Sequence, residues 1–138
     1  MYQMREMTIS DHDAAIDLWN RTEGMALSDA DLRGSIDYYL DRNLGMSFVC
    51  TLGDKLIGTI LCGHDGRRGY IYHVAVSKEH RGKSIGKNLV EKSLNKLKSE
   101  GIMKYHIMVI SDNEIGNQFW NIRAWIKREG ILLYSSNT

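Results

Sequence analysis

The sequence has 138 residues, a net charge of +1 and 43% hydrophobic residues, proportions typical of an ordinary globular protein with one sizeable core. No apolar stretch approaches the roughly 18 residues of a membrane span, and the N-terminus lacks the layout of a signal peptide. We therefore expect a single domain, residues 1–138, in the cytoplasm.

The N-terminal half of the chain is predicted to contain a strand, two helices and a hairpin. Hydrophobic spacing places them at residues 2–7, 11–22, 28–43, 46–52 and 56–62. Ser10 and Ser28 are expected to cap the two helices. The hairpin strands are apolar at most positions, which indicates a sheet covered on both faces.

The C-terminal half is predicted to alternate strands and helices before ending in a strand pair. The expected elements are a strand at 70–76, a helix at 84–100, a strand at 103–110, a helix at 113–121, and strands at 125–128 and 131–134. Cys50 and Cys62 lie in separate apolar segments without zinc-ligand spacing, so we expect two buried thiols and no metal site.

Charge is divided unevenly along the chain. Residues 1–65 carry 5 basic and 11 acidic side chains, whereas residues 66–138 carry 13 basic and 6 acidic ones. A basic half suits an anionic ligand and an acidic half a cationic one, although solvated surface helices explain the same pattern. The lysines of helix 84–100 come without interleaved aromatic residues, so we expect no nucleic-acid partner, and the lack of a long apolar stretch predicts no membrane partner.

The junction between strand 70–76 and helix 84–100 is the strongest functional feature. The basic, glycine-containing turn aims backbone N–H groups and a helix dipole at one point, which suits a phosphate, and Arg81, Lys83 and Lys87 add positive charge. One interpretation is a structural turn capped by Ser84. Another is a nucleotide phosphate loop, because Gly82-Lys83-Ser84 matches the end of a Walker A motif, although its first glycine would fall at Ser77.

A third interpretation comes from resemblance. Arg81-Gly82-x-x-x-Gly86 at the head of a helix resembles the [Q/R]-x-x-G-x-[G/A] signature of the GNAT superfamily of N-acetyltransferases, with Ser84 at the middle glycine. A serine fits there if its φ is negative. The segment from Asn113 to Trp120 resembles the family's N-x-x-A-x-x-[FW]-Y block, with Gly116 replacing alanine. The resemblance implies an α/β (α+β) fold, with a mixed central sheet of about six to seven strands flanked by four helices on both faces.

The resemblance also implies direct transfer of an acetyl group from acetyl-CoA, the co-substrate, to a primary amine. The pyrophosphate would be wrapped by the turn and helix start, and the pantetheine would contact the backbone of the preceding strand and the Asn113 side chain. The implied pyrophosphate residues are Arg81, Gly82, Lys83, Ser84, Ile85, Gly86 and Lys87, and the implied strand residues are Val74, Ala75 and Val76.

The acid and base are less well defined by the sequence. The family's usual general acid, a tyrosine, is replaced by Trp120, whose indole N–H does not supply a proton at neutral pH. Strands 70–76 and 103–110 contain no carboxylate, so Tyr72 and His73 are the candidate catalytic residues. Strand alternation places Tyr72 with Tyr70 and Val74 on one face, and His73 on the other. Core roles for both, or catalysis without a side-chain base, stay open.

The acceptor remains undefined. The connection between the first two helices carries Glu23, Asp29 and Asp31, which would favour a cationic amine, although acids also complement a helix N-terminus. A peptide N-terminus, a free amino acid, a polyamine and an aminoglycoside all remain open. The alternative function is a CoA-binding sensor or interaction module without turnover, and a homodimer is also left open.

Overall fold

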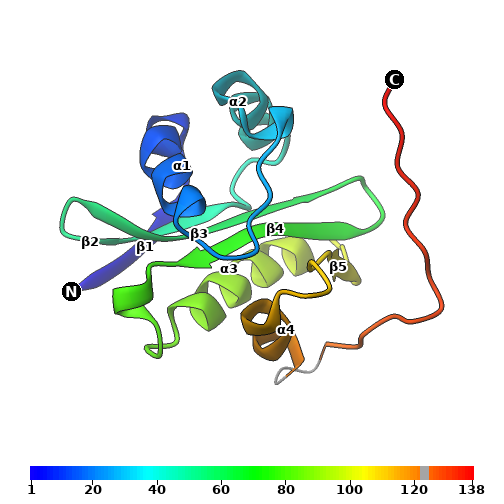
Figure 1. Ribbon diagram of the computed structural model, residues 1–138. Helices are drawn as coiled ribbons and strands as arrows, with labels where there is room; N and C mark the ends of the chain where they lie inside the picture. The colour runs from blue at the N-terminus through cyan, green and yellow to red at the C-terminus, as the bar shows by residue number, and fades with distance from the viewer. Residues whose placement is uncertain (122–124) are drawn as a thin grey trace. The chain divides into compact units, whose positions relative to one another are not determined.

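The computed structural model describes residues 1–121 and 125–138, in two compact units, Met1–Met108 and Val109–Thr138. The first unit contains a five-stranded sheet in the spatial order β1-β2-β3-β4-β5 (Figure 1). Neighbouring strands are antiparallel except β4 and β5, which are parallel, so the sheet is mixed. The strands are β1 (Tyr2–Glu6), β2 (Phe48–Leu52), β3 (Lys55–His64), β4 (Gly69–Val76) and β5 (Tyr105–Ile107).

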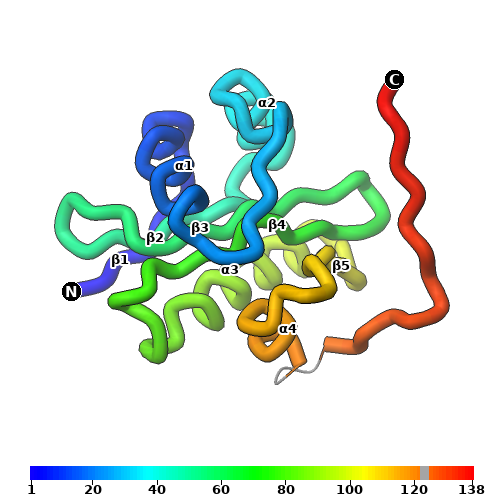
Figure 2. The backbone as a smooth tube through the Cα atoms, in the orientation of Figure 1, coloured from blue at the N-terminus to red at the C-terminus, as the bar shows by residue number. Residues whose placement is uncertain are grey.

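Helices cover both faces of this sheet. Figures 1 and 2 show α1 and α2 on one face and α3 on the opposite face. Their bounds are α1 (His12–Asn20), α2 (Arg33–Arg42) and α3 (Ile85–Ser99), and three short 3-10 helices, η1 (Ile9–Asp11), η2 (Asp29–Asp31) and η3 (Lys78–His80), join the elements. The second unit contains α4 (Glu114–Asn121).

The core explains why these elements form. Every residue of β3 from Leu56 to Gly63 is buried, which confirms that the sheet is covered on both faces. Under α1 and α2, Trp19 and Leu18 pack against Leu61 and Ala75 of the sheet. On the other face α3 buries an apolar stripe at helical spacing that includes Leu89 and Leu97.

The prediction of six to seven strands is wrong for the residues that the structure describes, because the sheet has five. Residues 125–128 and 131–134 form no strand, and Leu132 and Tyr134 are 75% and 86% exposed. A short apolar run indicates a strand only if another strand pairs with it, and that pairing is not encoded locally. Thr8, rather than Ser10, starts the first helical segment, and its N–H donates to Asp11. Ser28 does act as a cap, but of η2, where its Oγ accepts the N–H of Ala30; α2 begins only at Arg33 and has no side-chain cap.

Strand β4 contains a β-bulge that the sequence pattern does not predict. Thr59 of β3 pairs with Ala75 and Leu61 pairs with Tyr72, so His73 and Val74 lie opposite the single residue between them. His73 adopts a φ of +51°, in the left-handed region. The predicted alternation is therefore wrong beyond Tyr72: the extra residue shifts the phase, and Ala75 joins Tyr72 in the core under α1 and α2.

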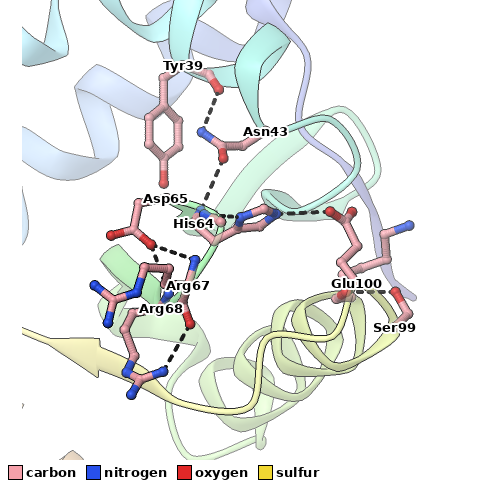
Figure 3. A network of polar contacts seen from close by, with 10 residues as sticks. Tyr39, Asn43, His64, Asp65, Arg67, Arg68, Ser99 and Glu100 are labelled. Atoms are coloured by element: carbon pink, nitrogen blue, oxygen red, sulfur yellow. Dashed lines mark hydrogen bonds and ion pairs between the residues drawn. The ribbon is translucent and has the colours of Figure 1, made fainter.

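The end of α2 is joined to the end of β3 by one amide side chain, drawn in Figure 3. Asn43 Nδ2 donates to the carbonyl of Tyr39 at 3.2 Å, and its Oδ1 accepts the N–H of His64 at 3.1 Å. A Cβ on Gly63 would lie 2.6 to 2.8 Å from the three amide atoms of Asn43. The glycine is therefore required by the close approach of this side chain.

We expect Gly63→Ala to lower the free energy of unfolding by about 1–3 kcal/mol, because Asn43 must move and leave buried polar groups unpaired. Urea unfolding monitored by circular dichroism measures this change. The matched control is Gly34→Ala, since a Cβ there meets nothing within 4 Å and a helical alanine is slightly stabilising. Equal stabilities for the two variants would contradict the proposed contact.

The two thiols lie in the core as predicted. Cys50 and Cys62 are free and fully buried, and burial raises the pKa of the Cys62 thiol to about 12. In the described ranges, no three His, Cys, Asp or Glu side chains come together as metal ligands. Within the same ranges, no helix combines the length and apolar character needed to cross a bilayer.

Candidate functional site

The turn between β4 and α3 leads into the first turn of α3, which no side chain caps. Gly82 and Ser84 adopt φ values of +78° and +64°, so the expectation of a negative φ at Ser84 is wrong. This conformation explains why a glycine suits the middle position of the motif. Ser84 is the N-cap of α3, but its side chain makes no capping hydrogen bond. The first N–H groups of α3 lack intrahelical acceptors and can therefore serve an anion.

We expect Ser84→Gly to stabilise the protein by about 0.5–1 kcal/mol, because glycine adopts the left-handed region without the steric strain of a Cβ. Thermal and urea unfolding measure the change. Ser84→Ala is the matched control: it retains the strain and removes a hydroxyl that makes no cap, so its stability should stay near that of the wild type. A glycine variant no more stable than the alanine variant would refute a strained turn.

Arg81 ties this turn to its surroundings. Its Nε donates to the carbonyl of Val76 at 2.9 Å, and its Nη2 contacts Oε1 of Glu23 at 2.5 Å. Burial opposes ionisation of Glu23, but the hydrogen bond and charge of Arg81 outweigh it and lower the pKa of Glu23. The Arg81 charge is thus already paired, whereas Lys83 and Lys87 are exposed at the helix start. Lys87 Nζ lies 4.0 Å from Oε1 of Glu91, which is the upper distance limit for an ion pair.

The strand leading into the turn has an open edge. Parallel pairing of β4 with β5 covers only Gly69, Tyr70 and Ile71. Among its described residues, the first unit contains no other strand that pairs with the rest of β4 on that side. An open edge presents main-chain N–H and C=O groups that an extended ligand can bind. Val74, Ala75 and Val76 lie on this part of the strand.

A pocket of about 990 Å³ lies within the first unit, between the α1–α2 connection, α2 and strands β3 and β4. Tyr38, Tyr39, Tyr70 and Tyr72 contribute to its walls. The rings of Tyr39 and Tyr72 meet edge to face at 6.4 Å. Burial, helped by the nearby Tyr70, raises the pKa of Tyr72. The Tyr72 hydroxyl therefore stays protonated at neutral pH.

Both predicted catalytic residues line this pocket. His73 Nε2 lies 2.7 Å from Oδ1 of Asp31, and the two side chains are only 15% and 9% exposed. The bulge brings His73 to the same pocket as Tyr72, although alternation placed them on opposite faces. Sequence reasoning missed Asp31 as the partner of His73, because the two residues are 42 positions apart and no local pattern links them.

The acidic side chains of the connection between α1 and α2 mostly contact partners inside the protein. Glu23 pairs with Arg81 and lies 3.8 Å from Lys78, and Asp31 pairs with His73. Of the three carboxylates expected to attract a cationic amine, only Asp29 makes no ion pair within the described residues. Two of these three acidic side chains therefore contact basic residues inside the protein, and they do not form an acidic entrance for a cationic amine.

The second unit contains the Asn113–Trp120 block. Asn113 Oδ1 accepts the N–H of Gly116 at 3.1 Å, which caps α4. A Cβ on Gly116 would lie 2.5 Å from Asn113 Nδ2, so the capping geometry explains the glycine that replaces alanine. Trp120 is 9% exposed and packs against the rings of Phe119 and Trp125, at centroid distances of 4.8 and 4.5 Å.

The profile of the acetyltransferase (GNAT) family matches residues 9–123. The chain belongs to this family. The sequence is 28% identical to an acetyltransferase of Pectobacterium atrosepticum over 113 residues, covering 81% of this chain and 79% of the relative. The nucleotide phosphate loop is therefore the wrong interpretation of the Gly82-Lys83-Ser84 motif.

Solved structures confirm the fold of this acetyltransferase. The PaiA N-acetyltransferase of Thermoplasma acidophilum, in complex with coenzyme A, gives a TM-score of 0.74 at 18% identity, covering 88% of this chain and 87% of that one. A predicted acetyltransferase of Clostridium acetobutylicum with acetyl-CoA gives 0.75 at 14% identity, covering 98% and 96%.

Proposed function

We propose that this chain transfers the acetyl group of acetyl-CoA directly to a primary amine, carried by a small molecule or by the N-terminus of a peptide or protein. The observation that carries the proposal is the continuity of β4. Its bulged residue, His73, lines a pocket, its open edge follows, and the strand then leads into the uncapped start of α3. Family membership and the coenzyme A complexes of the structural relatives support the same conclusion.

The proposed cofactor residues divide into two groups. The N–H groups from Gly82 to Lys87, with the side-chain charges of Lys83 and Lys87, would hold the pyrophosphate. Main-chain groups of Val74, Ala75 and Val76 would hold the pantetheine arm at the open edge of β4. Arg81 would act by fixing the turn, because its guanidinium is engaged by Val76 and Glu23. The role of Asn113 rests on the motif alone. We also propose that the chain forms one acetyltransferase domain.

In the proposed reaction, His73 accepts the proton that the amine loses as its nitrogen bonds to the acetyl carbon. A main-chain N–H of β4 donates to the carbonyl oxygen of the thioester, which becomes negative in the transition state. The Tyr72 hydroxyl donates the proton that the departing thiolate needs. This assignment uses a protonated tyrosine, consistent with the raised pKa of Tyr72.

Thiol release from acetyl-CoA in the presence of a panel of amines tests this function. The panel should include amino acids, a peptide with a free N-terminus, a polyamine and an aminoglycoside. We expect an amine-dependent release of CoA thiol, with an acetylated product of matching mass. Stabilisation of the protein by acetyl-CoA without any acetylated amine would instead identify a CoA-binding module. A thermal shift with ATP and magnesium, but none with acetyl-CoA, would refute both.

A further inference from the structure

Asp31 is a buried residue whose polar atoms contact three other residues. Its Oδ1 lies 2.7 Å from Nε2 of His73, and its Oδ2 accepts the N–H of Ser28 at 2.9 Å. Its main-chain carbonyl lies 2.8 Å from Nε2 of His12. Asp31 is 7% exposed, so these contacts are shielded from water. The carboxylate therefore joins the connection between α1 and α2 to the bulge of β4.

His73 is held on its other sides as well. The ring of Trp19 packs edge-on against the imidazole at 4.6 Å. Trp19 Nε1 donates to Oγ1 of Thr59 at 2.8 Å, and that hydroxyl donates to the carbonyl of His73 at 2.9 Å. These contacts fix both the ring and the left-handed backbone of His73. Such local strain, maintained by surrounding contacts, is typical of functional sites.

We propose that Asp31 is a positioning residue that sets the tautomer of His73, with the proton on Nε2 and the basic lone pair on Nδ1. This inference rests on the proposed function for its catalytic meaning. An ionised carboxylate only accepts hydrogen bonds, so the nitrogen beside it must carry the hydrogen. In a neutral imidazole the other nitrogen is then the acceptor. Nδ1 is thus the atom that takes the amine proton.

Each proton that moves in the proposed acetyl transfer has a donor and an acceptor. As the N–C bond forms and the C–S bond breaks, one amine proton moves to His73 Nδ1 and the thiolate receives the Tyr72 proton. Solvent then removes the proton from His73 and restores that of Tyr72. The Asp31 carboxylate accepts the hydrogen bond of Nε2–H and stabilises the imidazolium through it. The other titratable or charged side chains that line the same pocket are Tyr38, Tyr39, Arg42, His64, Asp65 and Tyr70.

The Asp31→Asn variant separates this role from a purely structural one. The asparagine Oδ1 can still accept the N–H of Ser28, so the cap that holds the connection is preserved. Its NH₂ group must then face His73 Nε2, which becomes an acceptor and moves the ring proton to Nδ1. The fold is kept while the tautomer is reversed. Asp37→Asn, at an exposed position of α2, removes the same charge and is the matched control.

Nitrogen-15 NMR of the imidazole rings tests the tautomer directly, with the His73 signal assigned by its loss in His73→Ala. We expect the Nε2–H form in the wild type and in Asp37→Asn, and the Nδ1–H form in Asp31→Asn. A wild-type Nδ1–H tautomer, or an Asp31→Asn spectrum that keeps Nε2–H, would overturn the inference.

The second measurement is the steady-state kinetics with an amine of the panel that the protein acetylates. Asp31→Asn should lower kcat by about 10²–10⁴-fold with the KM for acetyl-CoA within about twofold, and should add little to His73→Ala. A kcat equal to that of Asp37→Asn would overturn the catalytic role. If no amine is acetylated, the proposed function fails, and the NMR result alone decides the tautomer claim.

Discussion

His73→Ala lowers kcat/KM for the amine by about 10²–10⁴-fold, the usual contribution of a general base, and leaves the affinity for acetyl-CoA nearly unchanged. The reason is that His73 is the basic side chain fixed in the pocket by Asp31 and Trp19. Steady-state kinetics over a range of pH measures the loss.

Because alanine is strained at a φ of +51°, His73→Asn is the second variant for this prediction. Asparagine tolerates the left-handed region and has no basic nitrogen, so it separates loss of the base from disturbance of the bulge. Both variants should lose the same activity. An asparagine variant with wild-type rates and an unchanged pH profile would remove His73 from the reaction.

Lys83→Glu combined with Lys87→Glu weakens acetyl-CoA binding by about 100-fold or more, equivalent to about 2.8 kcal/mol. Both lysines are exposed at the start of α3, so reversing their charge places two carboxylates beside the proposed pyrophosphate site. Acids near a helix N-terminus are favourable for the helix itself, so the fold should be retained. Calorimetric titration with acetyl-CoA measures the affinity, and the loss should shrink as salt is raised.

The matched control for the lysine pair is Lys98→Glu with Lys104→Glu. These positions are also exposed, and they lie near the end of α3 and just before β5. The double substitution changes the net charge by the same amount without touching the turn. Equal weakening in both double variants would indicate a general effect of charge, and it would argue against a phosphate site at residues 82–87.

The parts of the site that sequence alone predicted are those encoded by neighbouring residues. The phosphate turn follows from a strand, a basic glycine-containing segment and a helix, all contiguous in the chain. The buried sheet follows from the apolar runs in β2 and β3. Tyr72 and His73 are predictable as titratable residues on the strand before the turn, and the structure places both at one pocket.

The parts that sequence did not predict depend on contacts between distant residues. The bulge at His73 follows from its pairing with β3 and from the hydroxyl of Thr59, neither of which has a local signature. The pairing of Asp31 with His73 and of Glu23 with Arg81 spans 42 and 58 positions. The sequence predicts that these acidic residues attract a cationic amine, whereas in the structure they contact basic side chains inside the protein.

A crystal structure with acetyl-CoA bound tests the central claim most directly. We expect diphosphate oxygens within hydrogen-bond distance of the N–H groups from Gly82 to Lys87. We also expect the pantetheine along β4 at Val74 to Val76, with the thioester beside the pocket that contains His73. A diphosphate bound elsewhere on the protein, or a thioester remote from His73, would contradict it.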